Sequence, residues 1–173
     1  MLKFASKEEA LQHLSNITGK KIKIAGLRDD LSKELYKKEG ADIEKVKSLL
    51  EDHKGKIKWF HISLAIHTED LKILELLLDK KPKLGDEKQI WIGAIDSKKP
   101  EKMVEMLLKA GAIPGSNALA NAKKSKNEDI IEMIEEGIEK KAREDAKKML
   151  ENNLSIDLII KITGLSKEEI EKL

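Results

Sequence analysis

The chain contains no cysteine, only three prolines and only five aromatic residues among its 173 residues. Without cysteine it can form neither disulfides nor thiolate metal sites, and it has no cysteine nucleophile. With so few rings it also lacks the aromatic platform on which proteins that bind single-stranded nucleic acid stack bases. We therefore expect a core of Leu, Ile, Ala and Met.

An excess of charge of one sign is also absent. The 34 basic residues nearly cancel the 32 acidic ones, which leaves a net charge of +2. Binding through phosphate neutralisation usually goes with a clear basic excess, so we expect no nucleic-acid partner. The uncharged runs are far shorter than the roughly 18 apolar residues of a membrane span, and the start MLKFASKEEA lacks a signal-peptide core. We expect a soluble cytoplasmic protein with no membrane partner, and the sequence leaves open its delivery into a host cell.

One pattern of apolar residues recurs four times along the chain. The string DIEKVKSLL at 42–50 is followed by DLKILELLL at 70–78, EKMVEMLL at 101–108 and EDIIEMI at 128–134. Equivalent residues of successive copies lie 28, 30 and 27 positions apart. Apolar residues at i, i+3 and i+4 predict an amphipathic helix in each copy.

A shorter segment of helical pattern precedes each copy. Three of these segments carry an alanine at a similar offset, and small side chains let two antiparallel helices approach closely. Glycine and proline between one pair and the next predict loops. Because a unit of this size cannot bury its apolar face alone, the copies should stack around a continuous core. The four segments are 31–40, 62–70, 91–99 and 117–127, and the alanines are Ala65, Ala94 and Ala122.

Two of the repeated strings resemble the ankyrin repeat. LAIHTEDLKILELLLDKK at 64–81 is similar to the pattern L-A-A-x-x-G-x-L-x-I-V-x-L-L-L-x-x-G, and MVEMLLKAGA at 103–112 matches its second half. The resemblance spans about 31–140 and implies an all-α, ankyrin-like helical-repeat solenoid of about four repeats with helical N- and C-terminal extensions. The repeats are shorter than the family's about 33 residues, and T-P-L-H appears only as FHIS at 60–63, so we expect irregular fingers. Another α-solenoid or an irregular helical bundle is the alternative.

The flanks of the repeats have helical signals of their own. A capping box from Ser6 to Glu9 predicts an N-terminal helix, and KKIKIA at 20–25 alternates like a short strand. We interpret the three lysines of that strand as a solvated edge rather than a phosphate site. This gives a capping helix and extended segment at 1–28, ankyrin-like repeats at 29–140 and a helical tail at 141–173. The repeats are approximately 31–56, 57–86, 87–115 and 116–140.

The tail carries a second resemblance. AKKMLENNLSIDLIIKITGLSKEEIEKL at 146–173 resembles the tail of bacterial PD-(D/E)XK nuclease-like transposases, the recombination-promoting nuclease family. A similar K-M-L…S-I-x-x-I-x-x-I-T-G-L-S-x-E-E-I motif follows the catalytic domain in that family. Its strand-borne Asp…Glu-x-Lys set is not visible, because the EKK at 139–141 lies in a helical, charged context. We therefore expect the tail without the nuclease activity.

The tail reads as two helices joined by a tight turn. Ser155 is placed to cap the first helix, Gly164 to end it, and Ser166 with Glu169 to form a capping box for the last. This is also the outline of a DNA-binding helix-turn-helix, but its recognition helix would be KEEIEKL, which has three Glu, two Lys and no Arg. Because glutamates would face the phosphates, we favour packing onto the repeats or self-association. The candidate self-association residues are Ile156, Ile159, Ile160, Leu165 and Ile170.

Catalytic motifs are missing from the chain. His13, His53, His61 and His67 share no spacing that brings two of them to one helix face. No G-x-S-x-G, glycine-rich phosphate loop or H-E-x-x-H occurs. We expect a protein that is not an enzyme and that needs no metal or cofactor.

The sequence therefore favours a non-catalytic protein–protein interaction module with an ankyrin-like surface. Its tryptophans fall just before the predicted inner helices, where they either shield the repeat joints or anchor a partner. One alternative is an inhibitor or antitoxin-like regulator whose tail associates with itself or with a nuclease carrying a similar tail; another is a DNA-binding regulator. The sequence does not identify the protein partner. The candidate partner-binding residues are Trp59, His61, His67, Thr68, Trp91, Asp96 and Ser97.

Overall fold

The structure is a computed structural model that describes residues 29–37, 40–53 and 55–173. These residues form ten helices and no strand, which confirms the expected all-α class for the described part of the chain. The predicted N-terminal helix and the segment 20–25 lie outside the described residues. No described helix has both the length and the apolar character to cross a bilayer. The chain divides after Lys56 into two units, which we describe separately.

The first unit contains a hairpin of α2 (Asp30–Leu35) and α3 (Ile43–Asp52). Both helices begin at an aspartate whose carboxylate accepts hydrogen bonds from backbone amides of the first turn, which have no partner within the helix. Asp29 caps α2 and Asp42 caps α3. Leucines and a valine form the apolar core of this hairpin. They are Leu31, Leu35, Val46 and Leu50.

The carboxylate of Glu34 is buried where α2 meets the start of α3. It accepts a 3.2 Å hydrogen bond from the backbone amide of Asp42 and pairs with Lys37 at 2.7 Å and Lys45 at 3.3 Å. Burial by itself raises the pKa of this carboxyl, but the hydrogen bonds from these groups outweigh burial and hold the pKa below its ordinary value. The ionised Glu34 therefore joins the two helices.

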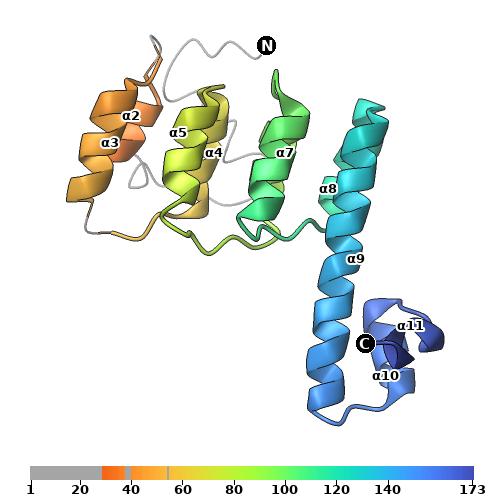
Figure 1. Cartoon of the computed structure of the whole chain (residues 1–173). Helices are drawn as coiled ribbons and strands as arrows, with labels where there is room; N and C mark the ends of the chain where they lie inside the picture. The colour runs from red at the N-terminus through yellow and green to blue at the C-terminus, as the bar shows by residue number, and fades with distance from the viewer. Residues whose placement is uncertain (1–28, 38–39, 54) are drawn as a thin grey trace, which may run out of the picture. The chain divides into compact units, whose positions relative to one another are not determined.

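Three further hairpins form most of the second unit. Their first helices contact one another in chain order, and so do their second helices, which places the hairpins side by side in two rows (Figure 1). These three hairpins correspond in sequence to the second, third and fourth of the helix pairs predicted from the repeat. The pairs are α4 (Trp59–His67) with α5 (Leu71–Leu78), α6 (Lys88–Ile95) with α7 (Pro100–Lys109), and α8 (Ser116–Ser125) with α9 (Glu128–Glu151).

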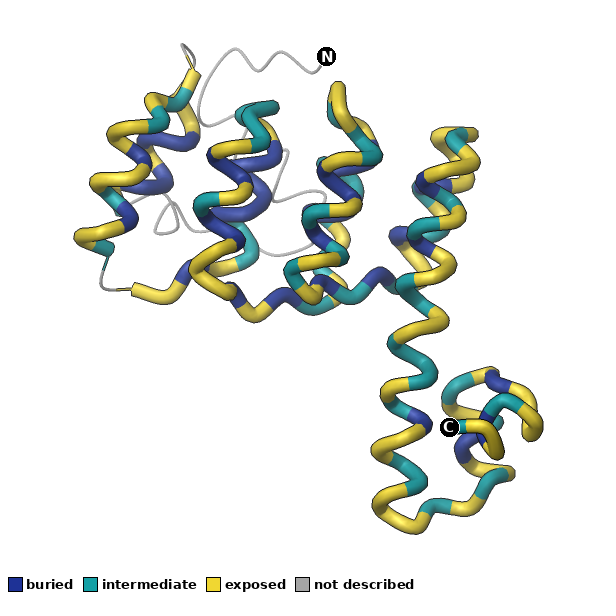
Figure 2. The backbone as a smooth tube through the Cα atoms, in the orientation of Figure 1, coloured by how far each residue is buried: buried dark blue, intermediate teal, exposed yellow. Residues whose placement is uncertain are grey.

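The apolar stripes of the second helices are buried as predicted. Positions spaced three and four residues apart face the neighbouring helices, so buried residues recur at each turn along the tube in Figure 2. The loops at 79–87 and 110–115 contain no strand. The fully buried members include Leu74, Leu77, Val104, Leu107 and Ile134.

A hydroxyl group fixes the turn inside each of these three hairpins. In every case a Thr or Ser donates a hydrogen bond to the carbonyl of an alanine three residues earlier, at the end of the first helix. The alanines are fully buried, which lets the first helices approach closely. The donor–acceptor pairs are Thr68 to Ala65 at 2.6 Å, Ser97 to Ala94 at 2.7 Å and Ser125 to Ala122 at 2.7 Å.

The last of these helices, α9, is 24 residues long and continues far beyond the fourth repeat. Its second half packs against α10 (Ile156–Thr163) and α11 (Lys167–Glu171). Residues 138–151 hold neither glycine nor proline to end the helix, and most are good helix formers. The boundary between repeats and tail, placed at 140 by the sequence, therefore falls inside one continuous helix.

Candidate functional site

The tail closes on a small apolar core of its own. Ala146 of α9, Ile159 of α10, Leu165 of the turn and Ile170 of α11 are each at most 6% exposed. Three of the residues predicted for self-association therefore belong to the core of the tail instead. They are Ile159, Leu165 and Ile170. Because they face one another, they are not available to a second molecule.

The turn and last helix of the tail follow the predicted signals. Gly164 adopts a left-handed backbone with φ of 75° and ends α10. The Ser166 hydroxyl accepts from the Glu169 amide at 3.3 Å, and the Glu169 carboxylate accepts from the Ser166 amide at 2.8 Å, so the capping box is confirmed. Ser155 occupies the cap position of α10, but its side chain makes no capping hydrogen bond, contrary to expectation.

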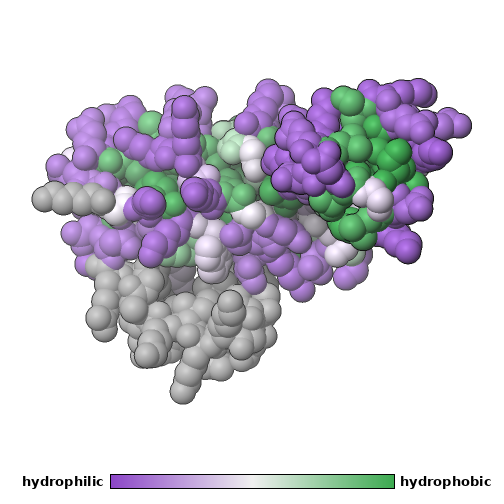
Figure 3. Space-filling view, turned by 90° about the horizontal axis from the view of Figure 1, so that it is seen from below, coloured by the Kyte–Doolittle hydropathy of each residue, from purple (hydrophilic) through white to green (hydrophobic). Residues whose placement is uncertain are grey.

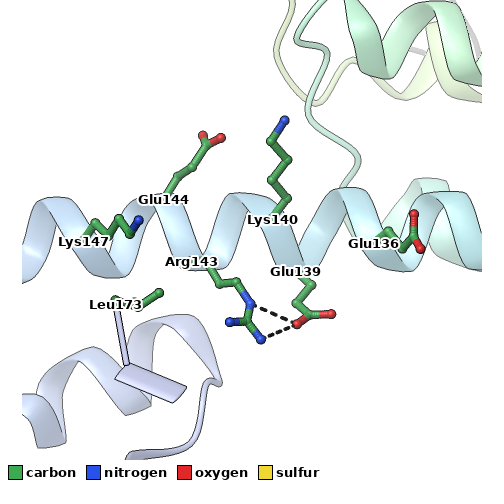
Figure 4. Close-up of a pocket in the computed structure, with 7 residues that line it drawn as sticks. All are labelled: Glu136, Glu139, Lys140, Arg143, Glu144, Lys147 and Leu173. Carbon is green, nitrogen blue, oxygen red and sulfur yellow. Dashed lines mark hydrogen bonds and ion pairs between the residues drawn. The ribbon is translucent and has the colours of Figure 1, made fainter. Parts of the chain in front are cut away.

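Arg143 joins α9 to α11. Its guanidinium lies 2.7 Å from the Glu139 carboxylate, a contact drawn in Figure 4, and 3.3 Å from that of Glu169. Hydrogen bonds from the Ser166 side chain and backbone, with a smaller contribution from the Arg143 charge, hold the pKa of Glu169 below its usual range. The adjacent surface pocket is lined by charged side chains of α9 and by Leu173 (Figure 4).

Two exposed apolar residues lie on α10 beside its core face. Leu158 is 44% exposed and Ile162 is 55% exposed, one helical turn apart. Figure 3 shows apolar atoms gathered at the right, where Figure 1 places α10 and α11. The remaining predicted self-association residues, Ile156 and Ile160, are half-buried beside the tail core. Of the α10 residues, Leu158 and Ile162 are the most accessible apolar ones, and their i, i+4 spacing is the sequence signal that could have identified them as a pair.

The tail is thus the second half of α9, a helix, a glycine-ended turn and a capped last helix. Residues 139–173 match the C-terminal HTH domain of the Rpn/YhgA-like nuclease family. The match begins inside α9 and includes α10 and α11, so the tail resemblance is confirmed. It does not include the repeats, for which the ankyrin resemblance stays a prediction. No curated protein and no solved structure matches the chain.

The chemistry of this HTH domain is balanced in charge. Residues 139–173 contain eight basic and eight acidic residues. Arg143 is the one arginine of the described residues, and two carboxylates already hold it. The last helix has only five residues and carries three glutamates. The outline of the domain is that of a helix-turn-helix, but this last helix lacks the Arg, Asn and Gln side chains that read base edges.

Two of the predicted partner-binding residues are buried. Trp91 is completely buried within α6, not ahead of it, because the helix begins at Lys88 and places Trp91, Ala94 and Ile95 on one inward face. His61 is 2% exposed within α4, and its Nδ1 accepts a 3.1 Å hydrogen bond from the Lys58 amide. These placements correct the expectation that a partner reaches both side chains.

The other predicted residues lie at the ends of first helices. Trp59 is the half-buried first residue of α4 and packs edge-on against Phe60, with ring centres 6.2 Å apart. Thr68 and Ser97 supply two of the turn-fixing hydroxyls, so their predicted contact with a partner competes with a structural role. His67 and Asp96 are exposed beside them. Within the described part of the chain, no three His, Asp or Glu side chains gather to hold a metal ion.

The exposed or half-buried residues on either side of the three hydroxyls form a series that we call the tip row. Each turn of the second unit contributes two members, one before its hydroxyl and one after. Neighbouring turns are tied together, since the Glu69 carboxylate accepts from the Lys98 amide at 3.0 Å. The tip row consists of His67, Glu69, Asp96, Lys98, Lys124 and Lys126.

Proposed function

We propose that this chain is a non-catalytic protein-binding module in which ankyrin-like repeats present the tip row to a partner. One observation carries the proposal: three turns share the same hydroxyl-to-alanine hydrogen bond, whereas their exposed neighbours change in charge from turn to turn. A constant backbone that displays chemically different side chains suits recognition of a specific surface.

Affinity capture from a lysate of the source organism, with the full chain as bait, tests this function. We expect the wild-type chain to retain a defined protein, and the triple variant H67A/D96A/K124A to lose it. The variant K80A/K83A/K88A alters exposed residues of the α5–α6 connection and the start of α6, and serves as the control that keeps binding. If all three chains retain the same proteins, or the wild type retains none, the proposal fails.

A second candidate function rests on Leu158 and Ile162. Here the tail associates with itself or with a nuclease that carries a similar tail, and the chain acts as an inhibitor or antitoxin-like regulator. Exposed Asp157 and Lys161 lie beside the apolar pair with the same four-residue spacing. Two antiparallel copies of α10 would therefore bring each charge next to its opposite.

Sedimentation of the full chain over a range of concentrations tests this second candidate. Two side chains per copy bury far less than the roughly 1,200 Å² of a standard interface, so we expect a weak dimer that dissociates on dilution. L158S/I162S should be monomeric, whereas Y36S, which changes another exposed large side chain, should behave as wild type. A wild-type chain that is monomeric throughout, and that does not bind a nuclease with the family's domain, would exclude it.

The HTH match is also compatible with DNA binding, supported by the helix–turn–helix outline of α10 and α11. The glutamates of α11 oppose phosphate contact, so we place this function third. A salt-dependent DNA shift assay decides it. We expect no complex. A complex that forms at low salt and is lost when the charges of Lys167 and Lys172 are reversed would instead establish DNA binding.

A further inference from the structure

Four exposed lysines occupy two adjacent turns of the second unit. Lys98 and Lys99 lie between α6 and α7, and Lys124 and Lys126 lie at the end of α8. None of these four forms an ion pair with a described residue, whereas the neighbouring Lys123 pairs with a glutamate of α9 at 3.1 Å. We call these four residues the lysine patch.

The two turns that carry the lysine patch are held together. The side-chain amide of Asn127, which follows Lys126, donates a 2.6 Å hydrogen bond to the carboxylate of Glu101 in the first turn of α7. The hydroxyls of Ser97 and Ser125 fix the same two turns internally. The backbone that carries the cations is therefore positioned before any partner arrives, which lowers the entropic cost of binding.

We propose that the lysine patch binds an acidic segment of the partner protein. This inference rests on the proposed function and states the partner's chemistry at one end of the tip row. Lysine ammonium groups are compact point charges that pair with individual carboxylates. No arginine occurs among the described residues of these turns, so recognition rests on these point charges.

A protein segment fits this surface better than nucleic acid does. Asp96 lies just before the first pair of lysines, and Glu128 and Asp129 lie just after the second, all three exposed. Duplex DNA carries a charge about every 1.7 Å along its axis, so it would bring phosphates against these carboxylates. A short acidic segment can be confined to the lysines, and the flanking carboxylates then remain available for cations of the same partner.

Fluorescence anisotropy with the full chain tests the inference. The probe is a labelled peptide of four consecutive glutamates between glycine–serine flanks. We expect binding at low salt that weakens as salt is added, because exposed ion pairs are screened. The variant K98Q/K99Q/K124Q/K126Q should lose at least about tenfold in affinity, since it removes four exposed pairs of modest individual strength.

The matched control is K80Q/K81Q/K83Q/K88Q. It removes the same charge from exposed lysines, and Lys81, with φ of 50°, has the same left-handed backbone as Lys126, with φ of 57°. We expect the control to bind as wild type does. Equal loss in both variants would reduce the effect to net charge and overturn the inference.

Two further outcomes would also overturn it. One is absence of peptide binding by the wild type at low salt, and the other is duplex DNA of equal charge binding through the patch as tightly as the peptide. The lysate capture distinguishes failure of this inference from failure of the proposed function. A captured protein that the glutamine variant still retains leaves the proposed function standing without an acidic segment, whereas no captured protein removes the function itself.

Discussion

The Glu101 carboxylate of one hairpin accepts a 2.6 Å hydrogen bond from the side-chain amide of Asn127, the cap of α9 in the next. The other end of the Asn127 side chain accepts from the backbone amide of Ile130 at 3.3 Å. Hydrogen bonds from its own backbone and from Asn127 hold the pKa of Glu101 below its ordinary value. One side chain thus begins a helix and ties two repeats.

Asn127→Ala removes both interactions. We expect it to lower the free energy of unfolding by about 1–2 kcal/mol, the upper part of the range for loss of a helix cap. Asn127→Ser retains a cap acceptor without reaching Glu101. Its free energy of unfolding should therefore lie between those of Asn127→Ala and the wild type. Urea denaturation measures both; equal stability of the serine and wild-type chains would show that the tie to Glu101 contributes nothing.

Glu34→Gln removes the buried charge of the first hairpin. Because hydrogen bonds involving charged groups contribute roughly 1.5–3 kcal/mol, we expect a loss of about this size at neutral pH. The pKa of Glu34 is lowered in the folded chain, so its stabilisation is present above the ordinary carboxyl pKa and disappears as pH falls through the folded value. Helicity followed in urea at several pH values should show the variant and wild type converging in acid, and a constant difference would contradict this.

Gly137→Ala tests a close approach in the middle of α9. A Cβ at this position would lie 2.8 Å from Leu108 Cδ2 and 2.9 Å from Pro114 Cγ. Alanine normally stabilises a helix interior by about 1 kcal/mol relative to glycine, but overpacking costs about 1–3 kcal/mol, so we expect net destabilisation or no gain. Because Leu108→Ala removes the overpacked Cδ2, the double variant G137A/L108A should lose less stability in thermal unfolding than the sum of the two single losses. Additive losses would place the strain elsewhere.

Ile159→Ala and Ile162→Ala differ by one turn of α10. Ile159 is fully buried in the tail core, so its truncation should cost about 2–5 kcal/mol. Ile162 is 55% exposed, and its truncation should stay within about 0.5 kcal/mol. Chemical unfolding of the full chain, followed at the tail by hydrogen exchange, distinguishes them. Similar losses for both would mean that the exposed face is covered.

The two tryptophans report on their environments separately. With Trp59→Phe, the remaining indole is the fully buried Trp91, and we expect blue-shifted emission that resists quenching by acrylamide. Trp91→Phe leaves the half-buried Trp59 and should give the opposite result. The Nε1 of Trp91 has no hydrogen-bond partner in the described structure, so phenylalanine removes an unsatisfied polar group and partly offsets the lost packing. Equal quenching of both variants would contradict the burial of Trp91.

Much of the helical framework follows from the sequence because it depends on local signals. The i, i+3, i+4 stripes correctly place Leu74 and Leu77 in the core, and Gly164 and Ser166 mark the tail turn. The predicted position of Trp91 ahead of its helix is wrong, because α6 begins at Lys88, three residues before it. Because Trp91 lies within the helix, its spacing of three and four residues from Ala94 and Ile95 places it on the same buried face.

The candidate surface was less predictable, because it depends on which side of each helix its neighbours cover. A nearly all-apolar α10 offered several faces for association, and packing against Ala146 selected Ile159 as core and left Leu158 and Ile162 outside. In the sequence, Thr68, Ser97 and Ser125 each follow one of the three repeated alanines by three positions. Their shared bond to an alanine carbonyl became apparent only with the turns in place.

The 24-residue α9 connects the last hairpin to the HTH domain without a linker. Inserting one residue near its middle would turn the HTH domain by about 100° around the helix axis and move it by about 1.5 Å, while both cores stayed intact. The length of this helix therefore determines the direction in which the face of α10 with Leu158 and Ile162 points. Insertions and deletions in α9 would re-aim that face without changing a single contact residue.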